Sequence, residues 1–246
     1  MSSNIVSSPI QYHNQKQLDY FGHEIKKTMI PVDSYYVNNH VEKLLEVADF
    51  SGKDNILEVG CGMGKFTFPL LKRGYKITGM DLSPFLLQQL LKYNDNRFQV
   101  PLIACDVLDA PLKLNNTFDH IIGFFALHHF HNLSVCYQAM ARLVKPGGKI
   151  YFIEPNAYNP LYYVQILATP NMSWAGDKGV ADMRKSKIQK ATEYAELVNL
   201  KVCRYGAFPP FIANIKIGQK IEKQIEKIKI LNPVLPFQLF EVQKPW

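Results

Sequence analysis

The sequence has few cysteines and no long apolar run, and both absences exclude whole classes of protein. The four cysteines, Cys61, Cys105, Cys136 and Cys203, are scattered and form no Cys-x-x-Cys pair. This spacing argues against a metal site or a disulfide framework and fits a reducing cytoplasm. No apolar run approaches the roughly 20 residues that a membrane-spanning helix needs, and the polar segment 1–19 has no signal-peptide core. We therefore expect a soluble, cytoplasmic protein without a metal ion.

Arginine is also scarce, although the formal net charge is +7. The five arginines are dispersed along the chain, and the positive excess comes from lysine. Proteins that bind nucleic acid phosphates gather Lys and Arg on one face. We interpret the charge as a bias of composition and expect no nucleic acid partner.

One lysine-rich segment, 217–230, has the pattern of an amphipathic helix. Its isoleucines fall on one stripe, with lysines opposite. Such a pattern is also typical of a helix on a membrane surface. However, Glu222 and Glu226 dilute the positive face, and no Trp or Phe anchors the stripe. We expect the stripe to pack on the domain, without stable membrane association.

The 246 residues suffice for one sizeable core, and their apolar pattern predicts an α/β fold. After a lead-in over 1–33, strands are expected at 55–60, 76–81, 101–105, 120–124, 149–154, 201–205 and 237–242. Helices are expected at 34–47, 65–74, from 84 onward, up to 143, at 188–198 and at 217–230. This alternation predicts a doubly wound, mostly parallel sheet covered on both faces, with ligands at the carboxyl ends of the strands.

The strongest local signal is a glycine-rich turn that follows the first expected strand. Gly60, Gly62 and Gly64 alternate with other residues, where the backbone must turn sharply and a ligand must approach it closely. A dinucleotide fingerprint needs its third glycine where Lys65 stands, and a phosphate-binding loop needs Ser or Thr where Phe66 stands. The loop therefore indicates a nucleoside ligand without a pyrophosphate.

Five features together resemble the class I S-adenosylmethionine-dependent methyltransferases, over about residues 33–244. They are the loop 58–64, Asp81 in Gly-Met-Asp-Leu-Ser, Cys-Asp-Val at 105–107, Phe-Asp-His at 118–120 with Ala-Leu-His-His at 126–129, and Leu-Val-Lys-Pro-Gly-Gly at 143–148. The resemblance implies a Rossmann-like sheet of seven strands, with strand seven antiparallel beside strand five. It divides the chain into a lead-in or lid, 1–33, and a methyltransferase domain, 34–246, with insertions at about 155–185 and 209–236.

The resemblance implies S-adenosylmethionine as cofactor and assigns roles around it. Asp81 would bind both ribose hydroxyls and Asp106 the adenine amino group, since ionised carboxylates make strong hydrogen bonds. Glu58 would orient the methionyl ammonium. Two phenylalanines after the fourth strand would either wall the sulfonium or simply pack in the core. The expected cofactor set is Glu58, Gly60, Gly62, Gly64, Asp81, Leu82, Asp106, Val107, Phe124 and Phe125.

The implied reaction is an in-line displacement at the activated methyl group. Positioning alone can lower such a barrier by about 7–11 kcal/mol. An oxygen or carbon acceptor would benefit from a base, and His128, His129 and Glu154 are the candidates, with His131 nearby. A structural role for the histidines is the alternative.

The acceptor is expected to bind to the appendages of the domain, where aromatic residues gather. These line a mostly apolar pocket or seal the appendages onto the domain; they are Tyr12, Tyr20, Tyr158, Tyr162, Trp174 and Phe211. We favour a small, partly apolar organic metabolite. The alternatives are a protein or another macromolecule as acceptor, and a protein that binds S-adenosylmethionine without methylating anything. The Asn/Asp-Pro-Pro-Tyr/Phe motif of base methylators is absent.

Overall fold

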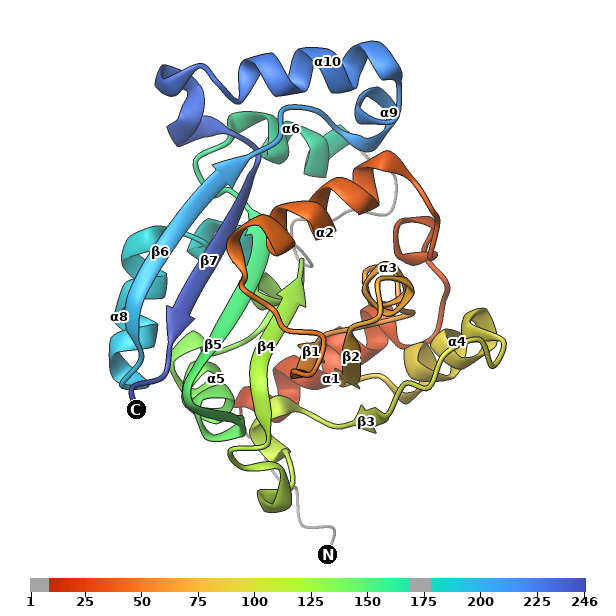
Figure 1. The fold of residues 1–246 in the computed structure, drawn as a ribbon, viewed down its shortest axis with the longest axis vertical. Coiled ribbons are helices and arrows are strands. Elements are labelled where there is room, and N and C mark those ends of the chain that lie inside the picture. The colour runs from red at the N-terminus through yellow and green to blue at the C-terminus, as the bar shows by residue number, and fades with distance from the viewer. Residues whose placement is uncertain (1–8, 169–177) are drawn as a thin grey trace, which may run out of the picture.

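The computed structural model describes residues 9–168 and 178–246, which fold around one sheet of seven strands (Figure 1). The strands are β1 (Asn55–Val59), β2 (Lys76–Asp81), β3 (Leu102–Ala104), β4 (Phe118–Phe124), β5 (Val144–Pro155), β6 (Val198–Tyr205) and β7 (Phe237–Gln243). Their order is β3-β2-β1-β4-β5-β7-β6. Neighbours from β3 to β5 are parallel, and β7 is antiparallel to both β5 and β6. The structure thus confirms the predicted doubly wound sheet and its antiparallel seventh strand.

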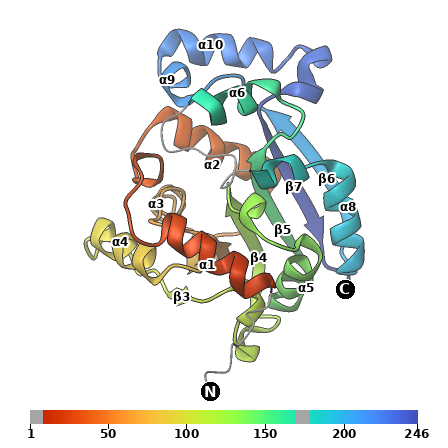
Figure 2. The same ribbon diagram turned by 180° about the vertical axis from the view of Figure 1, so that it is seen from behind.

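Helices cover both faces of this sheet (Figure 2). The α-helices are α1 (Pro9–Phe21), α2 (Tyr35–Val47), α3 (Thr67–Lys72), α4 (Pro84–Asn94), α5 (Leu133–Leu143), α6 (Pro160–Ala168), α8 (Lys185–Tyr194), α9 (Pro210–Ala213) and α10 (Lys216–Ile225). Short 3-10 turns are η1 (Lys27–Met29), η2 (Val107–Asp109), η3 (Leu112–Leu114), η4 (Leu127–His129), η5 (Lys178–Asp182) and η6 (Lys229–Val234). One apolar core joins the sheet to α5 and α8, and a second joins its other face to α2, α3 and α4.

The side chains of β5 alternate between the two faces of the sheet, so this one strand contributes to both apolar cores. Ile150 and Phe152 contribute to the core under α5 and α8, whereas Tyr151 and Ile153 contribute to the core under α2. Successive side chains of a strand point to opposite faces, so a strand covered on both sides must be apolar throughout. All four residues are only 1% exposed.

Polar caps begin the helices where the sequence predicts them. The Ser34 hydroxyl accepts from the Val37 N–H at 3.3 Å, so Ser34 and not Asp33 caps α2. The Ser83 hydroxyl accepts from the Leu86 N–H at 3.2 Å at the start of α4. Each cap satisfies one of the N–H groups that a helix start leaves unpaired.

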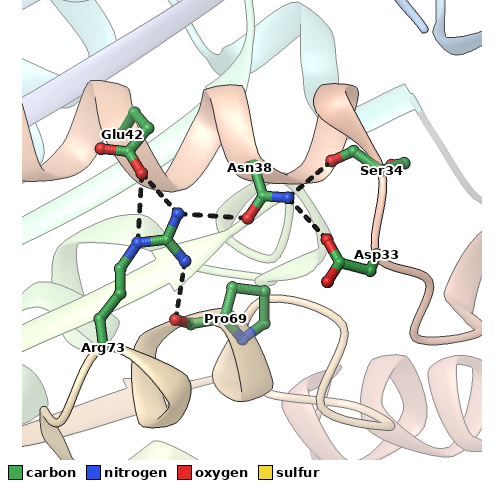
Figure 3. A network of polar contacts seen from close by, with 6 residues as sticks. All are labelled: Asp33, Ser34, Asn38, Glu42, Pro69 and Arg73. Carbon is green, nitrogen blue, oxygen red and sulfur yellow. Dashed lines mark hydrogen bonds and ion pairs between the residues drawn. The ribbon is translucent and has the colours of Figure 1, made fainter.

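A polar network fastens α2 to α3 (Figure 3). The Arg73 side chain, just after α3, donates to the Glu42 carboxylate, to the Asn38 side chain at 3.2 Å and to the Pro69 carbonyl at 2.9 Å. Asn38 in turn donates to the Asp33 carboxylate at 2.8 Å. The network joins the start of the domain to the helix that follows the glycine loop.

Several element boundaries differ from the sequence prediction, and strand pairing explains most of them. The helix expected at 188–198 ends at Tyr194, because Val198 pairs with Gln243 and so belongs to β6. The turn predicted at 145–148 lies within β5, as an irregularity opposite β4. Strand β3 starts at Leu102, one residue after the proline that cannot donate to a ladder.

The predicted packing of the isoleucine stripe on the domain is wrong. Ile217 and Ile221 of α10 are 66% and 44% exposed, while Gly218 and Glu222 are buried. The buried face is set by Glu222, which accepts hydrogen bonds from the loop ahead of α9. No helix in the described part of the chain is long and apolar enough to cross a membrane.

Candidate functional site

A cavity of about 440 Å³ opens at the carboxyl ends of β1, β2 and β4. Its walls come from the glycine loop, the turns after β2 and β3, the segment after β4, helix α1 and the loop leading to α9. Pockets of roughly 300–1,000 Å³ are typical of small-molecule sites. The sheet therefore places one ligand-sized pocket where doubly wound folds bind ligands.

The glycine loop forms the floor of the pocket. Gly60 and Gly62 have φ values of 74° and 53°, a region that L-residues with a side chain rarely adopt. A Cβ at Gly60 would lie 2.5 Å from the Cβ of Ala126, whereas one at Gly62 would meet only the Met29 methyl carbon at 3.9 Å. Gly62 therefore leaves open space above its backbone. Gly64 is not part of the lining, because it packs against the ring of Phe68.

Asp81 stands at the end of β2, and backbone groups hold its carboxylate in place. One oxygen accepts from the Gly62 N–H and the other from the Ser83 N–H, both at 2.8 Å. Burial raises the pKa of Asp81, while the two backbone hydrogen bonds oppose that rise. A carboxylate offers about four acceptor positions, so Asp81 keeps acceptor capacity for a ligand hydroxyl.

Asp106 follows β3 and contacts the N-terminal helix. One oxygen accepts from the Leu108 N–H at 2.9 Å, and the other accepts from the Asn14 side chain of α1. Helix α1 also reaches the far side of the pocket, because Nε2 of His13 lies 2.7 Å from the His129 carbonyl oxygen. Helix α1 therefore bridges the turns after β3 and β4.

Phenylalanines wall the pocket beyond β4. The ring of Phe124 stacks on Phe66 with centroids 4.4 Å apart. Phe125 has a φ of 53°, a backbone conformation that is strained for a bulky residue. Both Phe124 and Phe125 line the cavity.

Behind this wall His40 is enclosed by aromatic rings. The Tyr205 hydroxyl lies 2.6 Å from its Nδ1, and rings of Tyr36, Phe125 and Phe237 stand within 5.0 Å of the imidazole. Nε2 has no hydrogen-bond partner among the described residues. Burial lowers the pKa of His40 to about 3, so the ring is neutral at physiological pH.

His128 lines the pocket, and Glu154 at the end of β5 holds it from behind. Oε2 of Glu154 lies 2.5 Å from Nδ1 of His128, and Oε1 accepts from the N–H groups of Ala126 and Leu127 at 2.9 and 2.6 Å. Burial raises the pKa of Glu154 to about 8, while the hydrogen bonds from the backbone of Leu127 and Ala126 oppose that rise. Because the glutamate occupies Nδ1, any proton exchange with a bound molecule must use Nε2.

Two further histidines line the same pocket, in different surroundings. The ring of His129 packs edge-on against Phe21 of α1, 4.9 Å between centroids. His131 is exposed and lies 5.1 Å from the His13 ring. Of the sequence-predicted bases, Glu154 itself does not reach the cavity. Its place is behind His128.

Glu58 was expected to orient the cofactor, but its side chain lies outside the pocket. It is 1% exposed and accepts from the Thr67 hydroxyl at 2.7 Å, across the base of the glycine loop. Burial raises the pKa of Glu58 to about 8. This carboxyl braces the loop from below.

The aromatic residues expected around the acceptor divide into two groups. Tyr20 and Tyr162 line the pocket. Tyr12, Tyr158 and Phe211 do not, and they are 58%, 50% and 75% exposed, because each lies on the outward side of its helix or turn. The expectation for Trp174 lies outside the described residues.

Sequence reasoning missed several lining residues, above all Asn14, Met29 and Phe237. They come from segments distant in sequence, and no motif marks them; Asn14 lies 92 positions from Asp106. Lys65, noted only as a departure from the dinucleotide pattern, lines the pocket and donates to the Thr28 carbonyl at 2.8 Å. No cluster of metal-ligating side chains occurs in residues 9–168 and 178–246.

Comparison with known proteins finds methyltransferases. A family model described as "Methyltransferase domain" matches residues 57–152. The chain is 33% identical over 132 residues to the juvenile hormone acid O-methyltransferase of Drosophila melanogaster, covering 50% of this chain and 44% of that protein. It is 26% identical to the ubiquinone biosynthesis O-methyltransferase of Dechloromonas aromatica, covering 76% and 84%.

A solved structure shows the same fold. Geranyl diphosphate C-methyltransferase from Streptomyces coelicolor, in complex with S-adenosyl-L-homocysteine, aligns with a TM-score of 0.63 at 15% identity, covering 97% of this chain and all of that one. The chain spans less than half the length of the Drosophila relative, so that relative's activity is a property of a longer protein.

Proposed function

We propose that this chain, which belongs to the class I S-adenosylmethionine-dependent methyltransferases, transfers a methyl group to a small, mostly apolar organic acceptor. One observation carries the proposal. The glycine loop, Asp81 and Asp106 converge on a single cavity that continues to an aromatic wall and to His128. One end of the cavity suits a nucleoside, and the other suits an apolar molecule that gives up a proton.

The residues present fit S-adenosylmethionine. The open space above Gly62 admits a ligand against the backbone, and the oriented carboxylate of Asp81 offers its second lone pairs to vicinal hydroxyls. Asp106 offers an acceptor to an exocyclic amine. When bound, the cofactor supplies a methyl group already activated by the sulfonium. The protein's tasks are therefore to position the acceptor and exclude water.

His128 and Glu154 are proposed to manage the acceptor's proton. With Glu154 ionised, the ring hydrogen of His128 lies on Nδ1 and Nε2 is the acceptor atom. Nε2 then takes the acceptor's proton, and Glu154 stabilises the positive charge that develops on the ring. The two N–H groups that Glu154 accepts fix the turn carrying His128. In this assignment His128 is the base, Glu154 is a positioning residue, and His129 is part of the wall.

The acceptor side of the cavity supports an apolar substrate. Leu18 and Phe21 of α1, Met29, Tyr162 and Phe208 all line it. The relatives named above carry the names of small organic acceptors.

We propose that the lead-in, 1–33, acts as a lid, because α1 closes one side of the cavity. Four free cysteines fit the reducing cytoplasm proposed from the sequence.

Cofactor binding is tested first, by titration calorimetry of the purified chain with S-adenosylmethionine and S-adenosylhomocysteine. We expect saturable heat with both molecules. No heat at millimolar cofactor would overturn the proposal, whichever acceptor is present.

Acceptor class is tested by incubating the chain with methyl-labelled cofactor and fractionated cell extract. Label in the small, solvent-extractable fraction is expected. Label in protein or nucleic acid would assign a macromolecular acceptor. Cofactor binding without label in any fraction would instead favour a protein that binds the cofactor but does not transfer its methyl group.

A further inference from the structure

An exposed apolar surface covers the end of the molecule above the carboxyl ends of β4 and β6. Helices α6, α9 and α10 lie together there (Figure 1), with η6 following α10. The exposed apolar side chains of α9, α10 and the residues after each are Phe211, Ile215, Ile217, Ile221, Ile228 and Ile230, from 44% to 85% exposed. We call this set the isoleucine face. Ile221 and Ile228 line one hollow on the surface of α10, and exposed apolar patches mark interaction sites.

Lysines accompany the isoleucine face on α10 and on the residues after it. Five lysines of this segment are exposed: Lys216, Lys220, Lys223, Lys227 and Lys229. None of them forms an ion pair within the part of the chain that the structure describes. The two acids of the segment turn inward instead. Glu222 accepts from the Ala207 and Phe208 N–H groups, and Glu226 accepts from the Gly206 N–H at 2.6 Å.

This arrangement changes both arguments against a membrane surface. Glu222 is 2% exposed and Glu226 is half-buried, and hydrogen bonds turn both carboxylates toward the 206–208 loop. Phe211, on α9, supplies an exposed aromatic ring beside α10. An apolar stripe flanked by lysines is the chemistry of a helix that lies in the plane of an anionic bilayer, with lysine stems along the apolar surface and ammonium groups at the lipid headgroups.

We propose that the isoleucine face binds reversibly to the surface of an anionic lipid bilayer. Charge decides between this occupant and a second copy of the chain. A twofold contact would place the patch against itself and so bring five lysines of one copy against five of the other. Phosphate backbones of nucleic acids do not need the apolar stripe, which makes up most of the face.

The isoleucine face lies next to the pocket, and this position links the membrane contact to the proposed reaction. Ala207, Phe208 and Pro209 line the cavity and lead directly into α9. Leu161 of α6 both lines the cavity and is 67% exposed. A membrane at this end of the molecule would adjoin the acceptor side of the pocket, so an apolar acceptor could pass from the bilayer into the site. This last step rests on the proposed function; the membrane contact does not.

Flotation of the full chain with vesicles tests the contact without cofactor or acceptor. Vesicles of phosphatidylcholine with phosphatidylglycerol are compared with vesicles of phosphatidylcholine alone. We expect the protein to float with the anionic vesicles, and binding to fall as salt screens the lysines. Failure to float with anionic vesicles at low salt would overturn the proposal. Calorimetry with S-adenosylmethionine, run separately, distinguishes that failure from a failure of the proposed function.

Matched variants locate the contact. The Ile217→Asp/Ile221→Asp double variant should lower the vesicle partition coefficient at least about tenfold, because it removes apolar surface from the interface. Leu112→Asp is the control, since Leu112 is 74% exposed but lies in η3, between β3 and β4. Equal losses in both variants would contradict a localised face.

Charge is tested in the same way. Lys216→Glu/Lys220→Glu/Lys223→Glu should weaken binding about a hundredfold, since each lysine near an anionic surface contributes on the order of fivefold. The control reverses three exposed lysines elsewhere, at positions 53, 92 and 113, and should retain most binding.

Hydrogen exchange on the wild type gives an independent readout that needs no variant. Anionic vesicles should slow exchange across 211–230, and protection confined to other segments would contradict the proposal. Sedimentation without lipid tests the second copy: a dimer abolished by Ile217→Asp/Ile221→Asp would assign the face to self-association and overturn the membrane contact.

Discussion

The cofactor side and the acceptor side of the pocket are built differently. On the cofactor side, the turns after β1, β2 and β3 fix their polar groups through backbone hydrogen bonds, such as Gly62 N–H to Asp81. On the acceptor side, the walls come from α1, α6 and the loop before α9, and most of the side chains that line the pocket there are apolar or aromatic. A buried glutamate braces each side: Glu58 under the glycine loop and Glu154 behind His128. Polar groups fixed by the neighbouring backbone suit a ligand that does not vary, such as the cofactor. Apolar walls from segments distant in sequence suit an acceptor that can vary.

The largest expected effect is on the cofactor side. Asp81→Ala should weaken S-adenosylmethionine binding by about 100-fold or more, because hydrogen bonds to an ionised acceptor contribute about 1.5–3 kcal/mol each and two hydroxyls lose theirs. Calorimetry measures the change. Asp109→Ala, at an exposed acid of η2 outside the pocket, is the control and should bind normally. Unchanged affinity in Asp81→Ala would show that the ribose role is misassigned.

Substitution of the buried glutamates, Glu154 and Glu58, tests how much each one stabilises its side of the pocket. Glu154→Leu should lower the free energy of unfolding by about 3–4 kcal/mol, because two buried backbone N–H groups lose their acceptor at about 1–3 kcal/mol each. Glu58→Leu removes a partner only from the Thr67 hydroxyl and should lower it by about 1 kcal/mol. Urea denaturation measures both. Equal losses would mean that the turn after β4 does not depend on its glutamate.

The buried histidine behind the phenylalanine wall predicts a pH dependence of stability. Burial lowers the pKa of His40 from 6.5 to about 3. Below pH 6.5 the unfolded chain therefore binds a proton at His40 that the folded chain does not bind. As the pH falls from 6.5 toward 3, the free energy of unfolding decreases by about 1.4 kcal/mol per pH unit. His40→Gln, which keeps a partner for the Tyr205 hydroxyl, removes this loss. Wild type and variant should differ by about 2 kcal/mol more at pH 7 than at pH 5 in urea denaturation. A constant difference would mean that His40 titrates normally.

The smallest effect concerns the helix that spans both sides. Asn14→Ala removes the hydrogen bond from α1 to Asp106 and should raise hydrogen exchange in α1, since a hydrogen bond to an ionised acceptor contributes about 1.5–3 kcal/mol. Cofactor affinity should change less than about tenfold, because Asp106 itself is kept. Gln15→Ala removes an exposed bond to Asp19 on the same helix and serves as the control. Faster exchange in both variants would show that α1 is held by its own stability and not by Asp106.

The sequence predicted the residues at the glycine-loop end of the cavity better than those at the other end, for a physical reason. Gly60, Gly62, Asp81 and Asp106 each lie at the carboxyl end of a strand or within three residues after it, so period-two patterns and glycine geometry place them at one edge of the sheet. Asn14 could not be found this way, because its partner lies 92 positions away in a separate element.

The orientations of the buried acids were harder to predict from the sequence than the positions of the glycine loop and Asp81. Glu58 and Glu154 both end or nearly end a strand, and only packing shows that each points away from the cavity. For α10, the amphipathic period distinguished two faces but not which one is buried. Capping of the 206–208 loop by Glu222 and Glu226 turned the acidic side inward.

The position of β7 between β5 and β6 has a consequence for how the chain assembles. Strand β6 pairs only with β7 among the described strands, yet β7 follows it in the sequence, after α9, α10 and η6. During synthesis, at roughly 5–20 residues per second, one edge of β5 stays unpaired and β6 has no neighbouring strand until β7 has been made. Exposed strand edges invite pairing with other chains. The nascent protein is therefore most prone to aggregate in the seconds before Phe237–Gln243 emerges from the ribosome.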